Sequence, residues 1–382
     1  MFRHLKAKYI FFVFLFFSIF TFLPQGTIAQ EIYNEYQGTW HGKVVEVLEE
    51  EMRIIPGTDT EHLYQTVSVK VLDGPKEGKV ITIENDFLEL KKSDKFYFNY
   101  TRYRDGSETY GVVNIDRVGS LFFLFLVFAG AVVVFGGWQG IRSLLALAGS
   151  FLAIFYILLP GILNGWNPLL ASVLVAAGVL FAAIFFTHGF NRESLVAFSG
   201  TMIAVSITSL FAIFSVHITS LSGFNDDIST YLNFNTRGAL DFVSLLQAAI
   251  IIGVLGVLDD IAVTQAAVVT ELFNSNKDLT RREVYQKAIR VGREHVGALV
   301  NTLVLAYTGA SLPLLLHFYM ASSSLSMAIN TEFFATEIVR TFVGSIGLVM
   351  TVPIVTLLAV IYLKDYRPKH THSHSHIHGH TH

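Results

Sequence analysis

The sequence predicts a bundle of membrane-spanning α-helices that carries a small all-β domain near its N-terminus. Three observations lead to this fold class. Of the 382 residues, 52% are hydrophobic and only 15% are charged, whereas soluble proteins carry about 25% charge. Several apolar runs approach the ~20 residues that cross a bilayer. One segment, residues 30–117, is polar and shows the alternation of short strands and turns.

The N-terminus has the pattern of an export signal. Basic residues precede the apolar run 9–23, and small residues follow as far as Ala29. This pattern predicts a signal peptide over residues 1–29, with an uncleaved N-terminal anchor as the alternative. In both cases the N-terminus stays in the cytoplasm and the segment that follows is exported.

Residues 30–117 are expected to form the exported domain. They contain 17 Asp and Glu against 11 Lys and Arg, and this acidic surface disfavours nucleic acid as a partner. Turn residues stand at Pro56-Gly57, Asp73-Gly74-Pro75 and Asp105-Gly106. The strands predicted around these turns are 42–48, 64–72, 79–84, 95–103 and 109–115. Five short strands fit a small OB-like barrel.

Residues 118–363 are expected to form the transmembrane domain, with about seven spans. The predicted spans are 118–136, 142–160, 168–187, 194–217, 239–258, 299–319 and 338–362. If the first span starts outside, the inner loops and tail hold 11 Lys and Arg, whereas the outer connections between spans hold only Arg237, with Arg340 just inside the last span. By the positive-inside rule, residues 30–117 then lie outside and the C-terminus lies in the cytoplasm.

A cytoplasmic amphipathic segment is expected at 274–298, between the fifth and sixth spans. Within it, Val284, Ala288, Val291 and His295 recur at helical spacing among basic residues. A basic amphipathic helix at 280–298 would be drawn to anionic lipid. A solvated connector is the alternative.

Two adjacent carboxylates, Asp259 and Asp260, interrupt the apolar pattern without a turn signal. Ionisable groups beside a bilayer are costly, so a functional role is the default hypothesis. On the continuing helix, Asp260, Thr264 and Glu271 share one face, and such a polar stripe can line a water-filled path. Ordinary solvation at the membrane surface is the alternative for the whole stripe.

Other residues could take part in ion binding or transport. His188 lies in a loop on the same side and could relay protons or ligate a metal, although solvation is the commoner role of a loop histidine. Asp241 shares a helix face with Asp259 at a separation of ~27 Å, and Gln247 lies between them. These residues complete the set of candidates for transport or ion binding.

Two further patterns predict packing rather than chemistry. Arg340, near the end of a span, needs a carboxylate partner or extends outward to the membrane surface, and Asp241 and Glu337 are the nearest carboxylates by depth. Thr201, Thr208 and Ser215 recur every seven residues, a spacing of small hydroxyl residues that is typical of helix–helix contacts.

Several stretches resemble the YibE/F-like bacterial membrane proteins. The clearest is residues 258–266, Leu-Asp-Asp-Ile-Ala-Val-Thr-Gln-Ala. Others are His188-Gly189-Phe190-Asn191, the run 164–170, and the Asp-Gly-Pro-Lys-Glu-Gly-Lys run at 73–79. The resemblance extends from about Gly42 to the last span and implies a multi-pass protein of the bacterial plasma (inner) membrane. It implies no particular activity.

A weaker resemblance is to SecD/SecF and the resistance-nodulation-division exporters, which have an acidic motif on a fourth helix followed by a basic surface segment. Asp259 and Asp260 would occupy the acidic position. The large exported loop of those proteins is absent, because only the short turn 161–167 stands at its place. This resemblance favours a role in transport.

Enzymatic chemistry finds no support in the sequence. Cysteine is absent, so thiolate nucleophiles, thiolate metal sites and disulfides are excluded. No Walker loop, nucleophile elbow or HExxH motif is present.

The C-terminal residues 364–382 are expected to form a cytoplasmic His-rich tail. Imidazole is a good ligand of Zn²⁺ and Ni²⁺, so this tail could bind a divalent metal. A sticky terminus without a biological role is the alternative. Its alternating histidines are His370, His372, His374, His376, His378, His380 and His382.

Together these patterns predict a multi-pass plasma-membrane transporter or export-associated permease. The alternative is a non-transporting envelope scaffold or sensor, in which the exported β domain binds a partner and the helices are an anchor. Buried carboxylates at Asp259 and Asp260 would favour transport, and exposed ones would favour the anchor. The substrate, the protein partners and the oligomeric state are left open by the sequence.

Overall fold

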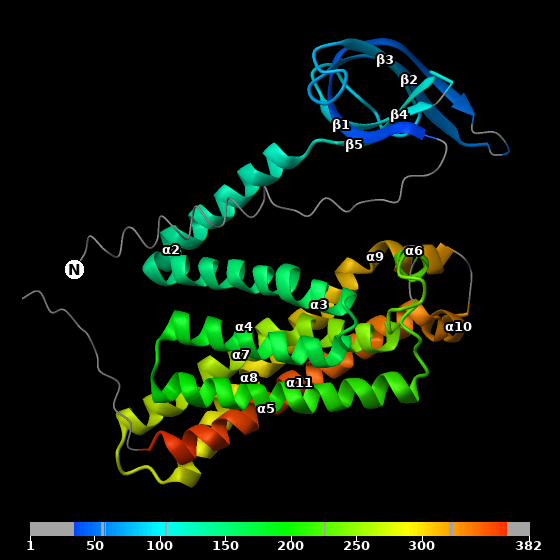
Figure 1. Cartoon of the computed structure of the whole chain (residues 1–382). Helices are drawn as coiled ribbons and strands as arrows, with labels where there is room; N and C mark the ends of the chain where they lie inside the picture. Colours follow the sequence, from blue (N-terminus) through cyan, green and yellow to red (C-terminus); the bar gives the residue numbers. More distant parts are fainter. Residues whose placement is uncertain are drawn as a thin grey trace, which may run out of the picture. The chain divides into compact units, whose positions relative to one another are not determined.

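A computed structural model describes residues 34–54, 57, 59–103, 105–224, 227–320 and 324–364 (Figure 1). Contacts between Cα atoms divide the chain into two units, Met1–Ala131 and Val132–His382. The first unit contains a β-sheet and the start of a long helix, and the second contains the remaining helices. The predicted signal segment 1–29 and the His-rich tail from 370 lie outside the described residues.

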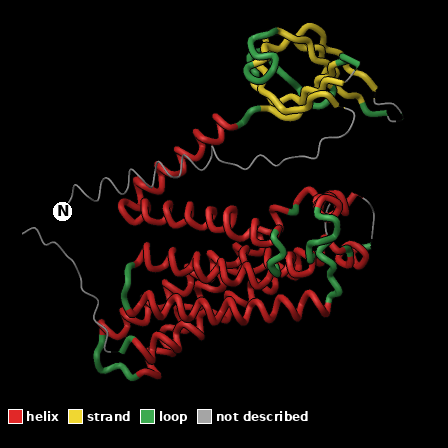
Figure 2. Tube along the Cα trace, in the orientation of Figure 1, coloured by secondary structure: helices red, strands yellow, loops and turns green. Residues whose placement is uncertain are grey.

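The N-terminal unit contains a five-stranded antiparallel sheet in the order β3-β2-β1-β4-β5, which curls into a half-barrel (Figure 2). The register of β1 shifts between Val44 and Glu46 and again between Val47 and Glu49, and such bulges increase local twist. All five predicted strands are confirmed. Closure into an OB-like barrel stays a prediction. The strands are β1 (Asn34–Ile54), β2 (Glu61–Val71), β3 (Val80–Asn85), β4 (Lys95–Tyr103) and β5 (Glu108–Ile115).

One face of this sheet forms the core of the unit. Val67, Val69 and Val71 alternate along β2 and are buried, together with Phe96 and Phe98 of β4. Because side chains of a strand alternate between its two faces, the period-two pattern in the sequence fixes the register of β2.

The turn after β2 is fixed against β1. Gly74 has φ +85°, and a Cβ there would lie 2.4 Å from Trp40, so both the conformation and the close approach require glycine. Beside it, Asp73 accepts a hydrogen bond of 2.7 Å from the backbone N–H of His41 and a second from the His41 ring. The first residues of the 73–79 run, Asp73 and Gly74, therefore have the structural role of fixing this turn against β1.

A polar cluster joins this turn to β4 and β5. Glu108 pairs with Lys76 and accepts hydrogen bonds of 2.8 Å from the hydroxyl groups of Tyr100 and Tyr110. The two tyrosine rings stack, with centroids 5.4 Å apart. These donors favour the ionised carboxylate and lower the pKa of Glu108 to about 2, with the Lys76 hydrogen bond as the largest cause.

This cluster predicts acid sensitivity. Because the pKa of Glu108 is lower in the folded state than its ordinary value of 4.5, the stabilisation is complete above pH 4.5 and is lost as the pH falls towards 2. Glu108 is partly exposed, so we expect a loss of about 1–2 kcal/mol. In the wild-type whole chain, the amide hydrogen-exchange rate of β5, corrected for the intrinsic rates, should rise as the pH falls from 4.5 towards 2. In Glu108→Gln, the corrected exchange rate of β5 should be raised already at pH 6. In the control Glu77→Gln, which changes a neighbouring exposed carboxylate, the rate at pH 6 should equal that of the wild type.

Five helices are long and apolar enough to cross a membrane, or six if the bent pair α8 and α9 forms one span, counted over the described residues. The fold is thus a helical membrane domain, as predicted. The long helices are α2 (Val118–Ala153), which continues through the π-helical turn Ile154–Leu158 and α3 (Leu159–Leu163), then α4 (Pro168–His188), α5 (Arg192–Ile218), α7 (Phe242–Ser275), α8 (Arg281–Ala310) and α11 (Glu332–Tyr362). The shorter ones are α6 (Asp227–Asn235), α9 (Leu312–Met320) and α10 (Leu325–Asn330).

α2 contains a break at Gly137, which has φ 53° and ψ −135°. Only glycine adopts such a conformation readily. Close by, a Cβ on Gly140 would lie 2.3 Å from the carbonyl oxygen of Val132, so the backbone approaches itself at this point. The break coincides with the predicted boundary between the spans 118–136 and 142–160.

α7 is the central helix of the second unit, because it packs against α4, α5, α8 and α11. α11 in turn packs against α5 and α8. Glycines allow the close approaches: a Cβ on Gly347 of α11 would lie 2.2 Å from the Thr208 hydroxyl oxygen of α5, and one on Gly344 would lie 2.5 Å from Val254 of α7. Thr208 is fully buried, which confirms the predicted packing role of this hydroxyl residue.

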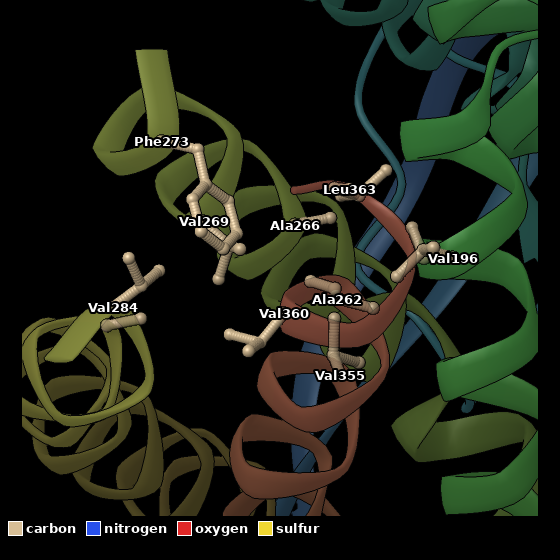
Figure 3. Close-up of a cluster of buried hydrophobic side chains, with 12 residues drawn as sticks. Val196, Ala262, Ala266, Val269, Phe273, Val284, Val355, Val360 and Leu363 are labelled. Carbon is tan, nitrogen blue, oxygen red and sulfur yellow. The ribbon is translucent and has the colours of Figure 1, made fainter. Parts of the chain in front are cut away.

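The predicted amphipathic segment 274–298 is not a separate helix. α8 begins after a capping box formed by Thr280 and Glu283 and runs without interruption to Ala310. Its first half buries Val284 in a cluster with Phe273 of α7 and Val360 of α11 (Figure 3). In the region of the predicted span 299–319, α8 and α9 meet at an angle of 61°.

Candidate functional site

The carboxylates Asp259 and Asp260 lie halfway along α7. The 34 residues of α7 extend over about 51 Å, well beyond the ~30 Å hydrocarbon core of a bilayer. Asp259 is 17 residues from the first residue of the helix, about 26 Å along its axis. The helix continues through the pair without a turn, as the sequence predicted.

The two carboxylates have different environments. Oδ1 of Asp259 is buried and has no hydrogen-bond partner within the described residues. The neighbouring side chains Leu258 and Ile261 are almost completely buried, whereas Asp260 is exposed in the single chain. Consecutive helical residues point ~100° apart, so Asp259 is partly buried at the edge of the bundle while Asp260 points away from it. An ordinary solvated aspartate would not hold a buried, unpaired oxygen.

Two histidines from other helices complete the surroundings of Asp260. His188, at the end of α4, and His295, on α8, both interact electrostatically with this carboxylate. His188 also interacts with Glu193 in the first turn of α5. The structure therefore places His188 within electrostatic range of Asp260. It adds His295, which the helical spacing had placed only on an apolar face.

A small cavity of about 20 Å³ with a mixed lining lies beside this region, between α7, α8 and α11, and its volume is about that of one water molecule. Thr264, Gln265 and His295 supply its polar lining. Gln265 is buried and donates hydrogen bonds of 2.9 Å to the Ala288 carbonyl oxygen of α8 and 2.7 Å to the Thr356 hydroxyl oxygen of α11. Gln265 thus ties three helices together, although its position within an apolar run gave no sequence signal of this role.

The remaining candidates lie apart from the carboxylate pair. Asp241 caps the start of α7 by accepting hydrogen bonds from the backbone N–H and the hydroxyl group of Ser244. Gln247 is buried 12 residues before Asp259, about 18 Å along the helix. Glu271 is exposed and lies a similar distance beyond the pair. The structure therefore groups only Asp259, Asp260, Thr264 and His188 from the predicted set.

The expected partner of Arg340 is confirmed as Glu337, with its Oε1 2.7 Å from Nη1 of Arg340. Asp241, the other candidate, is engaged in capping. No group of three or more His, Asp or Glu side chains is arranged to hold a metal ion in the part of the chain that the structure describes. The tail histidines lie outside that part, so metal binding there stays a prediction.

A family model for the YibE/F-like proteins matches residues 124–365, which is more than half of the chain. The chain belongs to the YibE/F-like family. The match confirms the resemblance and covers the helical domain of this YibE/F-like protein, including Asp259, Asp260 and His188. It begins after the β-sheet, so the 73–79 run lies outside it. The searches of curated proteins and of solved structures found no match.

Proposed function

We propose that this YibE/F-like protein is a transporter or export-associated permease of the bacterial plasma membrane, and that Asp259 binds the coupling proton or cation. The observation that carries the proposal is the buried Oδ1 of Asp259 on the central helix, for which the described residues provide no hydrogen-bond partner. A buried oxygen without a hydrogen-bond partner lowers the stability of the folded protein. Its presence in a membrane helix therefore favours a functional role for the carboxylate.

The arrangement around Asp259 supports a pathway. Asp259 is partly buried, and the exposed side chains of Asp260 and Thr264 follow it on α7. His188 and His295 interact electrostatically with Asp260. A proton or cation could reach Asp259 through these groups without crossing an apolar layer.

The proposal is tested by electrical measurement on the reconstituted whole chain. Proteoliposomes adsorbed on a solid-supported membrane are exposed to steps in proton or Na⁺ concentration. Wild-type protein should give a transient current well above that of protein-free liposomes, because an ion enters a site inside the membrane. If neither ion gives a current, the coupling role is rejected, and a scaffold or sensor anchored by the helices becomes the better account.

We further propose seven spans, with the β domain outside and the C-terminus in the cytoplasm. The break at Gly137 divides α2 into two spans, and the α8–α9 pair forms one, which together with the other four helices gives seven. The basic first half of α8 then lies on the cytoplasmic side, where it can contact anionic lipid. The positive charges flank the helix ends that this arrangement places inside.

This topology predicts the behaviour of fusion reporters. Alkaline phosphatase, which is active only outside the cytoplasm, should be inactive when it is fused after His382, whereas a fluorescent protein that folds in the cytoplasm should be bright there. Residues 30–117 should be cut by protease added to spheroplasts. An active phosphatase after His382 would require an even number of spans after the β domain and would overturn the seven-span arrangement.

A further inference from the structure

A second cavity lies between the α8–α9 pair and the α10–α11 pair. Its volume is about 680 Å³, within the range of small-molecule sites. The 61° bend at Ser311 turns α9 away from the axis of α8, and the cavity lies along this bend. None of its lining residues comes from α7, so it is separate from the site around Asp259.

The lining of this cavity is mostly apolar, with five aromatic rings and one carboxylate. Its charged member is Glu337, and the lining contains no Lys, Arg or His side chain. The polar groups of Thr308 and Thr341 accompany this carboxylate. The aromatic rings are those of Tyr307, Phe318, Tyr319, Phe334 and Phe342. Aromatic faces carry negative charge, so the rings and the carboxylate act in the same direction on a bound ion.

Glu337 retains capacity to bind a ligand. One of its oxygens, Oε1, accepts the hydrogen bond from Arg340, whereas no partner of Oε2 occurs among the described residues. The side chain is 17% exposed, so it is largely removed from water. Arg340 does not line the cavity, and its guanidinium group lies 6.0 Å from the centroid of the Tyr307 ring. Arg340 therefore orients the carboxylate and is a positioning residue.

We propose that this cavity binds an organic cation with an apolar or aromatic body. The rings would contact the body and the positive charge, and Oε2 of Glu337 would pair with the charge. An organic anion would be repelled by the Glu337 carboxylate. An acyl chain would form no favourable interaction with this carboxylate. The proposal goes beyond the transport role of Asp259 and does not depend on it.

Tetraphenylphosphonium and tetraphenylborate are suitable probes because they share one shape and carry opposite charges. Binding is measured by equilibrium dialysis on the whole chain in lipid nanodiscs, with empty nanodiscs as the blank for partition into lipid. We expect saturable binding of the cation above the blank and none of the anion. Equal saturable binding of both ions would overturn the proposal and indicate an apolar groove without charge selection.

Variants locate the binding in this cavity. Glu337→Gln should weaken binding of the cation at least ~10-fold, because the charge is lost while the shape is kept. Phe342→Ala should weaken it about 3- to 10-fold. Phe342 is 63% exposed, so this change should be tolerated by the fold. The matched control is Phe214→Ala on α5, which is 58% exposed and outside the lining, and it should bind as the wild type does.

Two results would reject the site. If both Glu337→Gln and Phe342→Ala keep wild-type affinity, the cation binds elsewhere. Glu337→Gln could fail to fold because Arg340 loses its partner. In that case the affinities of Phe342→Ala and Phe214→Ala for the cation are compared. Equal affinities of these two variants reject the cavity as the binding site. Loss of the Asp259 current leaves all these measurements unaffected, so failure of the transport role and failure of this site are distinguishable.

Discussion

Replacing Asp259 with asparagine is expected to abolish the transient current of the reconstituted protein, whereas Asp260→Asn should reduce it only a few-fold. The physical reason is the different burial of the two side chains: Oδ1 of Asp259 is buried and has no hydrogen-bond partner in the described part of the chain, whereas Asp260 is exposed. Asparagine has the same shape but cannot take up a proton or neutralise a cation. Solid-supported membrane recordings at equal protein density provide the measurement.

A stability measurement separates an ion-binding role of Asp259 from a structural one. Asp259→Leu should raise the thermal midpoint, because removal of a buried unpaired polar group recovers about 1–3 kcal/mol. The same variant should be electrically silent. A structural carboxylate would show the opposite pattern, with a lower midpoint in Asp259→Leu and Asp259→Asn and a retained current. Asp241→Asn is a useful control because it changes a helix cap without touching the pair.

Replacing Gly347 with alanine is expected to destabilise the helical domain by about 1–3 kcal/mol or more, through overpacking. The added Cβ would lie 2.2 Å from the hydroxyl oxygen of Thr208, which is fully buried and has no room to move. The helices α5 and α11 would have to separate. Thermal unfolding in detergent, followed by intrinsic tryptophan fluorescence, gives the size of the effect.

The matched control is Gly256→Ala on α7, where an added Cβ would meet nothing within 4 Å. Alanine favours a helix over glycine by up to about 1 kcal/mol, so this change should be neutral or slightly stabilising. Similar losses at Gly256 and Gly347 would show that the glycines act through backbone flexibility and would contradict the packing account. A combined Gly347→Ala, Thr208→Ala variant should recover part of the stability, because it removes the hydroxyl group in the way.

The sequence by itself determined the features that depend on local pattern. Strand-like runs bounded by turn residues located all five strands, because glycine, proline and aspartate at turns interrupt the strand pattern. Long apolar runs located the membrane helices, because a bilayer demands about 20 such residues. The Arg340–Glu337 pair was predictable as well, since residues three apart on a helix are neighbours.

Only the tertiary structure decided features that depend on which helices are neighbours. The sequence could not separate Asp259 from Asp260, because burial is set by the packing of α4, α5, α8 and α11 around α7. It gave no sign that Gln265 bridges three helices, since a single glutamine in an apolar run has many possible partners. The continuous α8 was missed because its first half is basic: packing against α7 and α11 buries only one face of it, and the charged face stays exposed.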